Sequence, residues 1–341
     1  MSYVNLGPRT YRAGDFEATL GAPLARFPQF GTAYYVDGDD GDDDNSGKAP
    51  SRAFLTIAAA ITAADDGDAI FIKPQAIAAT DTDPNSYTEN LVIPAAKRLA
   101  LIGAGYGLAQ GAQPQLKVGA TTTSPVLTIR SAGCLIAGLS INGSGGTGGG
   151  ILLDDDGGTS KNAFGTIVDG CFFKNCKGTT ATDGRTGGAV QWPAAGNSWQ
   201  VRITNNRFYK NVCDVLMKGT TSSVPQDVVI QGNIFSGTSG ATNATDVNIY
   251  VAADGILGLV IDSNVFPNIP NIGSGSVTDF YDIATGTYGI ISNNVFGCTG
   301  LTFGGTHTGG THPATVWMVH NYQQGAVAQE PANEGEIGYT A

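Results

Sequence analysis

Positive charge is scarce in this sequence, and its scarcity limits the partners that the protein can have. The chain of 341 residues carries 18 Lys and Arg against 29 Asp and Glu, which gives a net charge of −11. The phosphates of a nucleic acid would be repelled, and no cluster of basic residues offers a local exception. We therefore expect no nucleic-acid binding, while neutral glycans and protein surfaces stay open as partners.

Long apolar runs are also missing. No stretch of 18 apolar residues occurs, and the opening MSYVNLGPRTYRAGDF lacks the apolar core of a signal peptide. The sequence therefore predicts no membrane insertion and folding in a cytoplasm. The cysteines are odd in number, scattered and without a C-x-x-C pair, which favours small buried side chains over a disulfide framework or a metal site. They are Cys134, Cys171, Cys176, Cys213 and Cys298.

Glycine, asparagine and β-branched residues are abundant instead, and they recur in a short pattern. Such a composition predicts short strands and many turns. The copies are IVDGCF (167–172), ITNNRF (203–208), IQGNIF (230–235), IDSNVF (261–266) and ISNNVF (291–296), with a decayed copy MVHN, which ends at Asn321, and an earlier one, IAGLSI (136–141). The aromatic residues Phe172, Phe208, Phe235, Phe266 and Phe296 are 36, 27, 31 and 30 residues apart. A fixed motif with a variable period predicts a solenoid whose loops differ in length.

The intervals between copies are unsuited to helical repeats. Each contains two or three short apolar runs, such as GAVQWP and DVLMKG, interrupted by Gly and Asn, which lower helix propensity. One interval therefore forms one coil of a parallel β-helix, and coils stack at about 4.8 Å, the usual distance between strands. We expect the phenylalanines to form a file inside the coils.

The asparagines of the repeat are predicted to lie at a corner of each coil. We expect them to adopt the left-handed backbone conformation and to hydrogen-bond from coil to coil as a ladder. Contact with a ligand along one face is the alternative, and it is less favoured because regular repetition is what a structural corner requires. The predicted ladder comprises Asn206, Asn233, Asn264, Asn294 and Asn321.

The first part of the chain carries a family resemblance. The stretch YYVDGDDGDDDNSGKAPSRAFLTIAAAITAADDGDAIFIKP (34–74), followed by YTENLVI and LALIGAG, resembles the opening of right-handed parallel β-helix proteins of the pectin-lyase-like class. The resemblance covers Tyr34 to Tyr322. It is informative about fold and weak about activity, because this fold hosts lyases, hydrolases and inert structural proteins. Many members with this opening are bacteriophage spike or fibre proteins, or enzymes that act on polysaccharides.

Three regions of the chain follow from these patterns. Residues 34–323 are predicted to form an all-β, single-stranded, right-handed parallel β-helix, with an N-terminal capping α-helix near 54–65 for which Thr56 is the N-cap. Residues 1–33 contain spaced aromatics and are predicted to be an arm that orders against a partner, with a disordered leader as the alternative. Residues 324–341 are expected to be a tail that covers the last coil.

Acidic side chains are the first candidates for chemistry. Asp154, Asp155 and Asp156 end an apolar run, and paired carboxylates there would serve as acid and base in glycoside cleavage. A charged loop rim is the favoured alternative.

The acidic run Asp37 to Gly47 suggests a Ca²⁺ site at Asp37–Asp44, but the positions of its glycine and distal glutamate do not match those of an EF-hand loop. A solvated turn and no cofactor are therefore favoured.

Two aromatic residues and three histidines complete the candidates. Trp192 and Trp199 flank the loop PAAGNS and would stack on a sugar, although packing of this loop on the solenoid is the favoured account. No local carboxylate or cysteine completes a site around His307, His312 and His320, so no metal site is predicted.

Enzymes of the resembled class carry motifs that this sequence lacks. The N-T-D, G-H-G and R-I-K motifs of galacturonase-like hydrolases are missing, as is the R-x-P-x-x-R context of pectate lyases. None of those catalytic residues can be assigned to a position of this chain. Catalytic carboxylates that are dispersed, as in tailspike hydrolases, are compatible with these absences.

These features together favour a structural role over catalysis. They predict a bacteriophage spike, fibre or capsid-decoration protein, made in the host cytoplasm and located in the virion. Its expected partners are other virion proteins, reached through residues 1–33, further copies of itself in a homotrimer, and a host surface glycan. The alternatives are a tailspike-type polysaccharide hydrolase or lyase, and a glycan-binding module without turnover.

Overall fold

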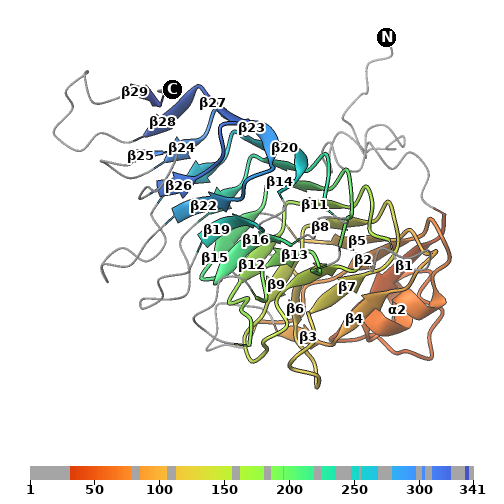
Figure 1. Cartoon of the computed structure of the whole chain (residues 1–341). Coiled ribbons are helices and arrows are strands. Elements are labelled where there is room, and N and C mark those ends of the chain that lie inside the picture. The colour runs from red at the N-terminus through yellow and green to blue at the C-terminus, as the bar shows by residue number, and fades with distance from the viewer. Residues whose placement is uncertain are drawn as a thin grey trace, which may run out of the picture.

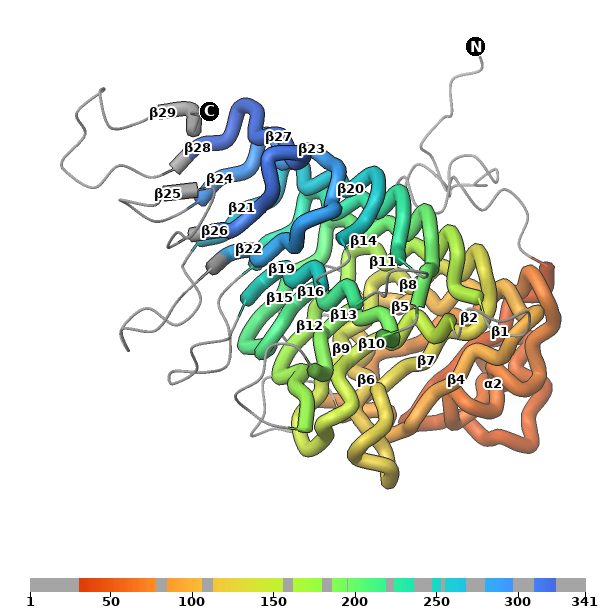
Figure 2. Tube along the Cα trace, viewed as in Figure 1, coloured from red at the N-terminus to blue at the C-terminus, as the bar shows by residue number. Residues whose placement is uncertain are grey.

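The protein is a parallel β-solenoid with three sheets along its length (Figure 1). A computed structural model describes residues 31–77, 85–105, 113–155, 162–179, 186–194, 196–218, 224–235, 247–252, 255–267, 279–296, 302–303, 309–323 and 335–337. Successive turns of the chain lie one beside the next from the N-terminal to the C-terminal end (Figure 2). Parallel strands joined by crossovers wind right-handed, so the fold is the predicted right-handed parallel β-helix.

The strands of each sheet follow one another in chain order, coil by coil, apart from β25. The first sheet contains β1 (Ala33–Val36), β2 (Ala69–Ile72), β5 (Ala100–Gly103), β8 (Leu135–Ala137), β11 (Ile167–Asp169), β14 (Arg202–Thr204), β17 (Val229–Gln231), β20 (Leu257–Asp262), β23 (Tyr288–Ser292) and β27 (Val316–Val319). The second contains β3 (Ser86–Thr88), β6 (Gln115–Lys117), β9 (Ser140–Asn142), β12 (Phe172–Lys174), β15 (Arg207–Tyr209), β18 (Ile234–Phe235), β21 (Val265–Phe266), β24 (Val295–Phe296), β28 (Asn321–Gln323) and β29 (Gly335–Ile337). The third contains β4 (Leu91–Ile93), β7 (Leu127–Ile129), β10 (Ile151–Leu153), β13 (Val190–Gln191), β16 (Cys213–Met217), β19 (Val247–Val251), β22 (Asp279–Ile283), β26 (Gly309–Thr311) and β25 (Thr302–Phe303). Among these described strands, only β28 and β29 pair antiparallel.

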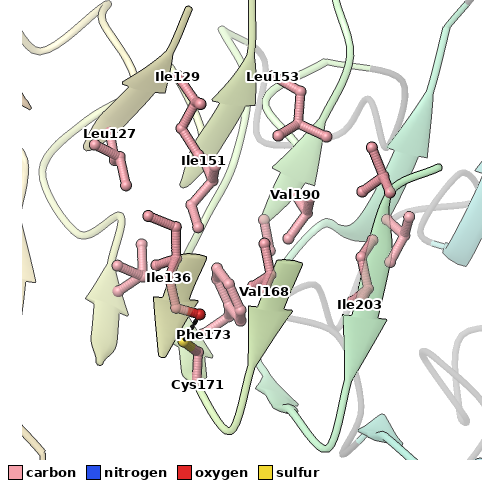
Figure 3. Close-up of a cluster of buried hydrophobic side chains, with 14 of the residues drawn as sticks. Leu127, Ile129, Ile136, Ile151, Leu153, Val168, Cys171, Phe173, Val190 and Ile203 are labelled. Atoms are coloured by element: carbon pink, nitrogen blue, oxygen red, sulfur yellow. Dashed lines mark hydrogen bonds between the residues drawn. The ribbon is translucent and has the colours of Figure 1, made fainter. Parts of the chain in front are cut away.

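Aliphatic residues from all three sheets and one file of phenylalanines fill the interior. Figure 3 shows side chains such as Ile136, Phe173 and Ile151 converging from the three sheets, and all three are buried. The phenylalanine file is stacked ring on ring, with centroids 4.7–5.0 Å apart from one coil to the next. It comprises Phe173, Phe208, Phe235, Phe266 and Phe296.

One member of the predicted file is wrong by one residue. Phe173 pairs with Phe208, whereas Phe172 pairs with Arg207 and stacks on Tyr209. The copy at 167–172 is therefore out of frame, because a shift by one residue turns each side chain of a strand to the opposite face. The pattern has to be aligned from Val168, which pairs with Ile203.

The asparagines of the repeat lie at the corner between the first and second sheets, fully enclosed. Each accepts hydrogen bonds from the preceding coil and donates to it. The Asn233 backbone and side-chain N–H groups both donate to Asn264 Oδ1, at 2.9 and 3.0 Å, and Asn264 Nδ2 donates to the Ile230 carbonyl at 2.9 Å. The same bonds recur along Asn206, Asn233, Asn264, Asn294 and Asn321.

The predicted reason for asparagine at this corner is wrong. The left-handed conformation belongs to the residue before each asparagine, with φ of 56° at Asn205, 55° at Ser263, 54° at Asn293 and 51° at His320. The ladder asparagines are selected instead for an amide that reaches the coils on both sides. A glycine, Gly232, takes the left-handed position in the coil of Asn233.

The N-terminal end of the solenoid is covered by a short helix and an extended segment. Helix α2 (Ile57–Ala63) begins at Thr56, whose side chain accepts from the Ala59 N–H, and it buries Ile57, Ala60 and Ile61. The edge of β1 is covered by residues 47–54, which include the 3₁₀ turn η2 (Pro50–Arg52). There the Tyr35 N–H donates to Gly47 and the Phe54 N–H donates to Tyr35. Two elements therefore share the predicted capping role. The helix covers the apolar interior, and the segment hydrogen-bonds the backbone N–H and C=O groups at the open edge of β1.

Pairing with the second coil starts at Gly31, whose N–H donates to the Gly67 carbonyl. Residues 1–30 of the predicted arm and most of the predicted tail lie outside the described residues, as does Cys298.

The other four cysteines are buried thiols, and burial raises the pKa of Cys134, Cys171 and Cys176 to about 12. Within the described parts of the chain, no helix is long and apolar enough to cross a membrane.

Candidate functional site

The structure describes two of the three predicted catalytic carboxylates, Asp154 and Asp155. Asp154 follows β10 and accepts from Arg130 Nε at 2.7 Å, so it is held in an ion pair with the preceding coil. Asp155 is 2% exposed. Asp156 lies outside the described residues. A general acid or base must come within hydrogen-bond reach of the substrate, and the positions of Asp154 and Asp155 favour a structural rim of the coil.

The two tryptophans occupy different environments. Trp192 is 1% exposed, and its indole N–H donates to the Ser198 carbonyl at 3.1 Å. This burial agrees with the favoured interpretation, packing of the loop on the solenoid, and leaves no exposed ring face on which a sugar could stack. Trp199 is 38% exposed and stacks on Phe164 at 5.4 Å, which leaves one face toward solvent. A ligand at Trp199 stays a prediction.

The carboxylates of the acidic run are committed to holding their own loop. Asp37 accepts from the Asp39 and Asp40 N–H groups and from Lys73 Nζ, and Asp43 accepts from the Thr56 N–H and hydroxyl. Partial burial raises the pKa of Asp37, but the Lys73 bond and the two amides outweigh it and lower that pKa. Nowhere in the described ranges do three His, Cys, Asp or Glu side chains gather as a metal site would require.

The histidines are separated by the fold. His312 is buried beside the Tyr281 hydroxyl, with Oη 3.4 Å from Nδ1, and burial lowers the pKa of its ring. His320 holds the left-handed corner position before Asn321. His307 lies outside the described residues, so the structure describes two of the three.

The feature that sequence analysis missed is an exposed apolar file on the outer face of the second sheet. It comprises Ile234, Val265, Val295 and Tyr322, which are 37%, 38%, 44% and 50% exposed. We call it the surface file. Its members are register partners in successive strands β18, β21, β24 and β28, so they lie directly above one another. Exposed apolar side chains in register form a continuous surface of the kind used for contacts with other molecules.

The surface file was detectable in the sequence. Each member stands between a buried asparagine and a buried phenylalanine, or directly after the asparagine in the case of Tyr322. Because side chains alternate across a strand, a phenylalanine that points inward turns the residue before it outward. Three aliphatic residues at an outward position are the signal. In the coil before Ile234, this position is taken by Arg207.

A rigid polar row borders the surface file across the corner. Gln231, Asp262 and Ser292 are register partners on the outer face of the first sheet. Asp262 accepts from both of the others, at 2.8 Å each, and also from Ser263 and Asn293 at 2.9 Å. Partial burial raises the pKa of Asp262, but these hydrogen bonds outweigh it and lower that pKa. The surface file therefore lies on a backbone fixed by the asparagine ladder and beside a row of interlocked side chains.

The chain is similar to several solved structures at low sequence identity. The chain is similar to the GH136 lacto-N-biosidase from Eubacterium ramulus, with 11% identity, a TM-score of 0.46 and coverage of 88% of this chain and 57% of that one. It is similar to the pectin methylesterase from Aspergillus niger, with 12% identity, a TM-score of 0.38 and coverage of 92% of both chains. It is also similar to ORF18 of Geobacillus virus E2, with 14% identity, a TM-score of 0.44 and coverage of 85% and 60%.

The chain thus spans less than two thirds of the length of the biosidase and of the viral protein. No protein-family model matches the sequence, and the comparison with curated proteins gave no match. At these identities the likeness concerns the fold alone, and activity has to be argued from the residues of this chain.

Proposed function

We propose that this chain is a structural protein of a bacteriophage particle, a spike, fibre or capsid-decoration protein that presents its β-helix on the particle surface. The surface file is the observation that supports a role in assembly. The virion assignment rests on the resemblance of residues 34–74 to the opening of phage β-helix proteins. Residues 1–33 would anchor the chain to other virion proteins, and the exposed coils would contact a host surface glycan.

The occupant that fits the surface file best is a second copy of the chain. Both copies carry the same row at the same strand spacing, about 4.8 Å, so side chains of two parallel solenoids can interdigitate over several coils. Contact through one row excludes water from four apolar side chains in each copy. Closed symmetry is the usual arrangement of such contacts, and three solenoids around a common axis form the homotrimer that we propose.

Location in the particle is tested by fractionating lysates of cells that produce the phage encoding this chain. The proposal predicts that the full-length chain sediments with particles in a density gradient, in a fixed copy number per particle. A chain that stays at the top of the gradient would contradict it. A variant that lacks residues 1–30 should fold but fail to join particles, and normal incorporation of that variant would refute the anchoring role.

Catalysis is tested separately with purified protein. The rival function, a tailspike-type hydrolase or lyase, predicts release of reducing ends from host capsule or lipopolysaccharide. The structural proposal predicts none. Product formation that disappears in an Asp154→Asn, Asp155→Asn variant, with unchanged thermal unfolding, would overturn the structural role in favour of an enzyme.

A further inference from the structure

An aromatic-lined pocket opens at the N-terminal end of the solenoid, far along the chain from the surface file. Its volume is about 300 Å³. Residues of β1 and β2 form one wall, and Pro50 and Ala53, from the segment that covers the β1 edge, form the other. The lining residues on which the argument depends are Tyr35, Asp37, Pro50, Phe71 and Lys73.

Two stacked aromatic rings give the pocket its apolar wall. Tyr35 and Phe71 are register partners in β1 and β2, and their rings lie nearly parallel with centroids 5.7 Å apart. Both are only half-buried. The next residue of this outward row, Ile102, is buried and aliphatic. Exposed aromatic surface in this row is therefore confined to the first two coils, where the pocket opens.

Asp37 and Lys73 are the charged side chains that line the pocket, and the carboxylates of Asp39 and Asp40 belong to the loop that follows Asp37. Lys73 Nζ lies 2.6 Å from Asp37 and 3.8 Å from Asp40, whose side chain is 87% exposed. The Asp39 carboxylate accepts from the Ala76 N–H at 2.9 Å. Three carboxylates thus surround one ammonium group, so the local field opposes an anionic ligand. The rim still offers both hydrogen-bond acceptors and a donor.

We propose that this pocket binds one neutral sugar ring of a glycan. The C–H face of a pyranose is apolar and packs against aromatic side chains, here against the ring edges and the uncovered ring faces of the Tyr35–Phe71 stack. The hydroxyl groups around the ring edge both donate and accept, which matches carboxylate oxygens beside an ammonium group. A mostly apolar pocket with a few converging polar groups is the usual form of a small-ligand site. The inference rests on the proposed function, because it names the class of host ligand that a surface protein would contact.

Binding is tested with purified full-length protein and the methyl glycosides of glucose, galactose and mannose, by ligand-observed NMR and titration calorimetry. We expect at least one of them to bind and free glucuronate, the anionic counterpart, to bind more weakly. Phe71→Leu keeps apolar volume but removes a ring, and should weaken binding about tenfold. Lys73→Met, at an exposed position, should weaken it less and leave thermal unfolding nearly unchanged.

Trp317→Leu is the matched control, because Trp317 is 69% exposed on the last coil of the same sheet. It should leave binding unchanged. The proposal would be overturned if no neutral glycoside bound, or if glucuronate bound more tightly than the neutral glycosides. It would also be overturned if Trp317→Leu lost binding while Phe71→Leu and Lys73→Met kept it. If the pocket binds no sugar, the result of the particle fractionation still decides the virion role. If the protein binds sugar but does not join particles, the virion role is refuted and the sugar site is not.

Discussion

The corner between the first and second sheets is built in two ways along the solenoid. In the N-terminal coils Leu139 and Cys171 occupy it, whereas asparagines occupy it from Asn206 to Asn321, and all are buried. The Cys171 thiol donates to the Ile136 carbonyl at 3.6 Å (Figure 3), and the Asn233 amide donates to the equivalent Ile203 carbonyl at 2.9 Å. The position therefore requires a buried group of limited size, and asparagine adds bonds to the coil on either side.

The outer face of the second sheet differs more between the two halves. In the N-terminal coils the row that becomes the surface file consists of Ser86, Gln115 and Ser140, and Gln115 Nε2 donates to the Ser86 hydroxyl at 2.8 Å. In the C-terminal coils the same row is aliphatic and exposed. The interior is apolar in both halves. Gln115, Ser140 and Phe172 of this row are buried, whereas the members of the surface file are exposed, so the two halves differ in how far the chain itself covers this face.

The largest effect is expected from breaking the asparagine ladder. Asn264→Leu would remove the acceptor of two Asn233 N–H groups and leave them buried. Because each buried unsatisfied group costs about 1–3 kcal/mol, we expect a loss of about 3 kcal/mol in the free energy of unfolding, measured in urea. The neighbouring Ser263→Gly is the control. It relieves a left-handed residue but loses the bond to Asp262, so it should change stability little. A loss below about 1 kcal/mol for Asn264→Leu would mean that the ladder is dispensable.

The next effect concerns the surface file. Val265→Lys would place a charge in the middle of the apolar row, and it should weaken self-association by about 2 kcal/mol, or about thirtyfold. The fold should be unaffected because Val265 is partly exposed. Sedimentation velocity over a range of concentrations measures the change. Gln231→Lys adds the same charge in the adjacent polar row and should leave association much closer to that of the unmodified protein. Equal effects of the two variants would show that charge alone, and not the file, controls association.

A smaller effect is the loss of stability expected in the C-terminal coils when the pH falls. All three histidines lie after residue 300, and burial lowers the pKa of His312 below its ordinary 6.5. The unfolded chain then binds a proton before the folded chain does. The stability contributed by neutral His312 is therefore complete above pH 6.5 and is lost as pH falls from 6.5 toward the lower folded-state pKa. Hydrogen exchange at pH 5 and pH 8, corrected for intrinsic rates, should show loosening of β22 and β27 at pH 5, with β2 and β5 unchanged. In His312→Gln this difference should shrink, and a pH response spread evenly over all coils would contradict the assignment.

The smallest effect is predicted for Cys171→Asn, which extends the ladder by one coil. The new amide would donate to the Ile136 carbonyl that the thiol now uses, and its oxygen would face the Leu139 N–H. We expect a change in unfolding free energy within about 1 kcal/mol. A matched Cys171→Asp variant, which buries a charge at the same point, should be clearly destabilised. Equal destabilisation of both variants would show that the two kinds of corner are not interchangeable.

The repeat was sufficient to predict the fold, the phenylalanine file and the asparagine corner, because each depends on a side chain that recurs at a fixed place in every coil. It failed where a coil departs from the pattern. Phe172 and Phe173 are adjacent, and the sequence does not say which of them faces inward. The left-handed residue was misassigned by one position, since Asn205 and Asn206 are both asparagines that suit a turn.

The candidate sites were less predictable than the fold. Trp192 stands next to turn-forming residues, but its burial depends on coils distant in sequence. The pocket at Tyr35 and Phe71 requires two residues 36 positions apart to become register partners. The surface file follows from the motif, because the residue before each inward phenylalanine points outward, but the sequence alone does not show that this outward row is exposed.

The most direct test of the account is the mass of the unmodified full-length protein in solution, measured by native mass spectrometry and sedimentation equilibrium. Side-by-side contact of exposed apolar rows predicts an assembly of three chains that separates when Val265 is replaced by lysine. A single chain at every concentration up to the solubility limit would contradict it, and the exposed row on the C-terminal coils would then need another occupant.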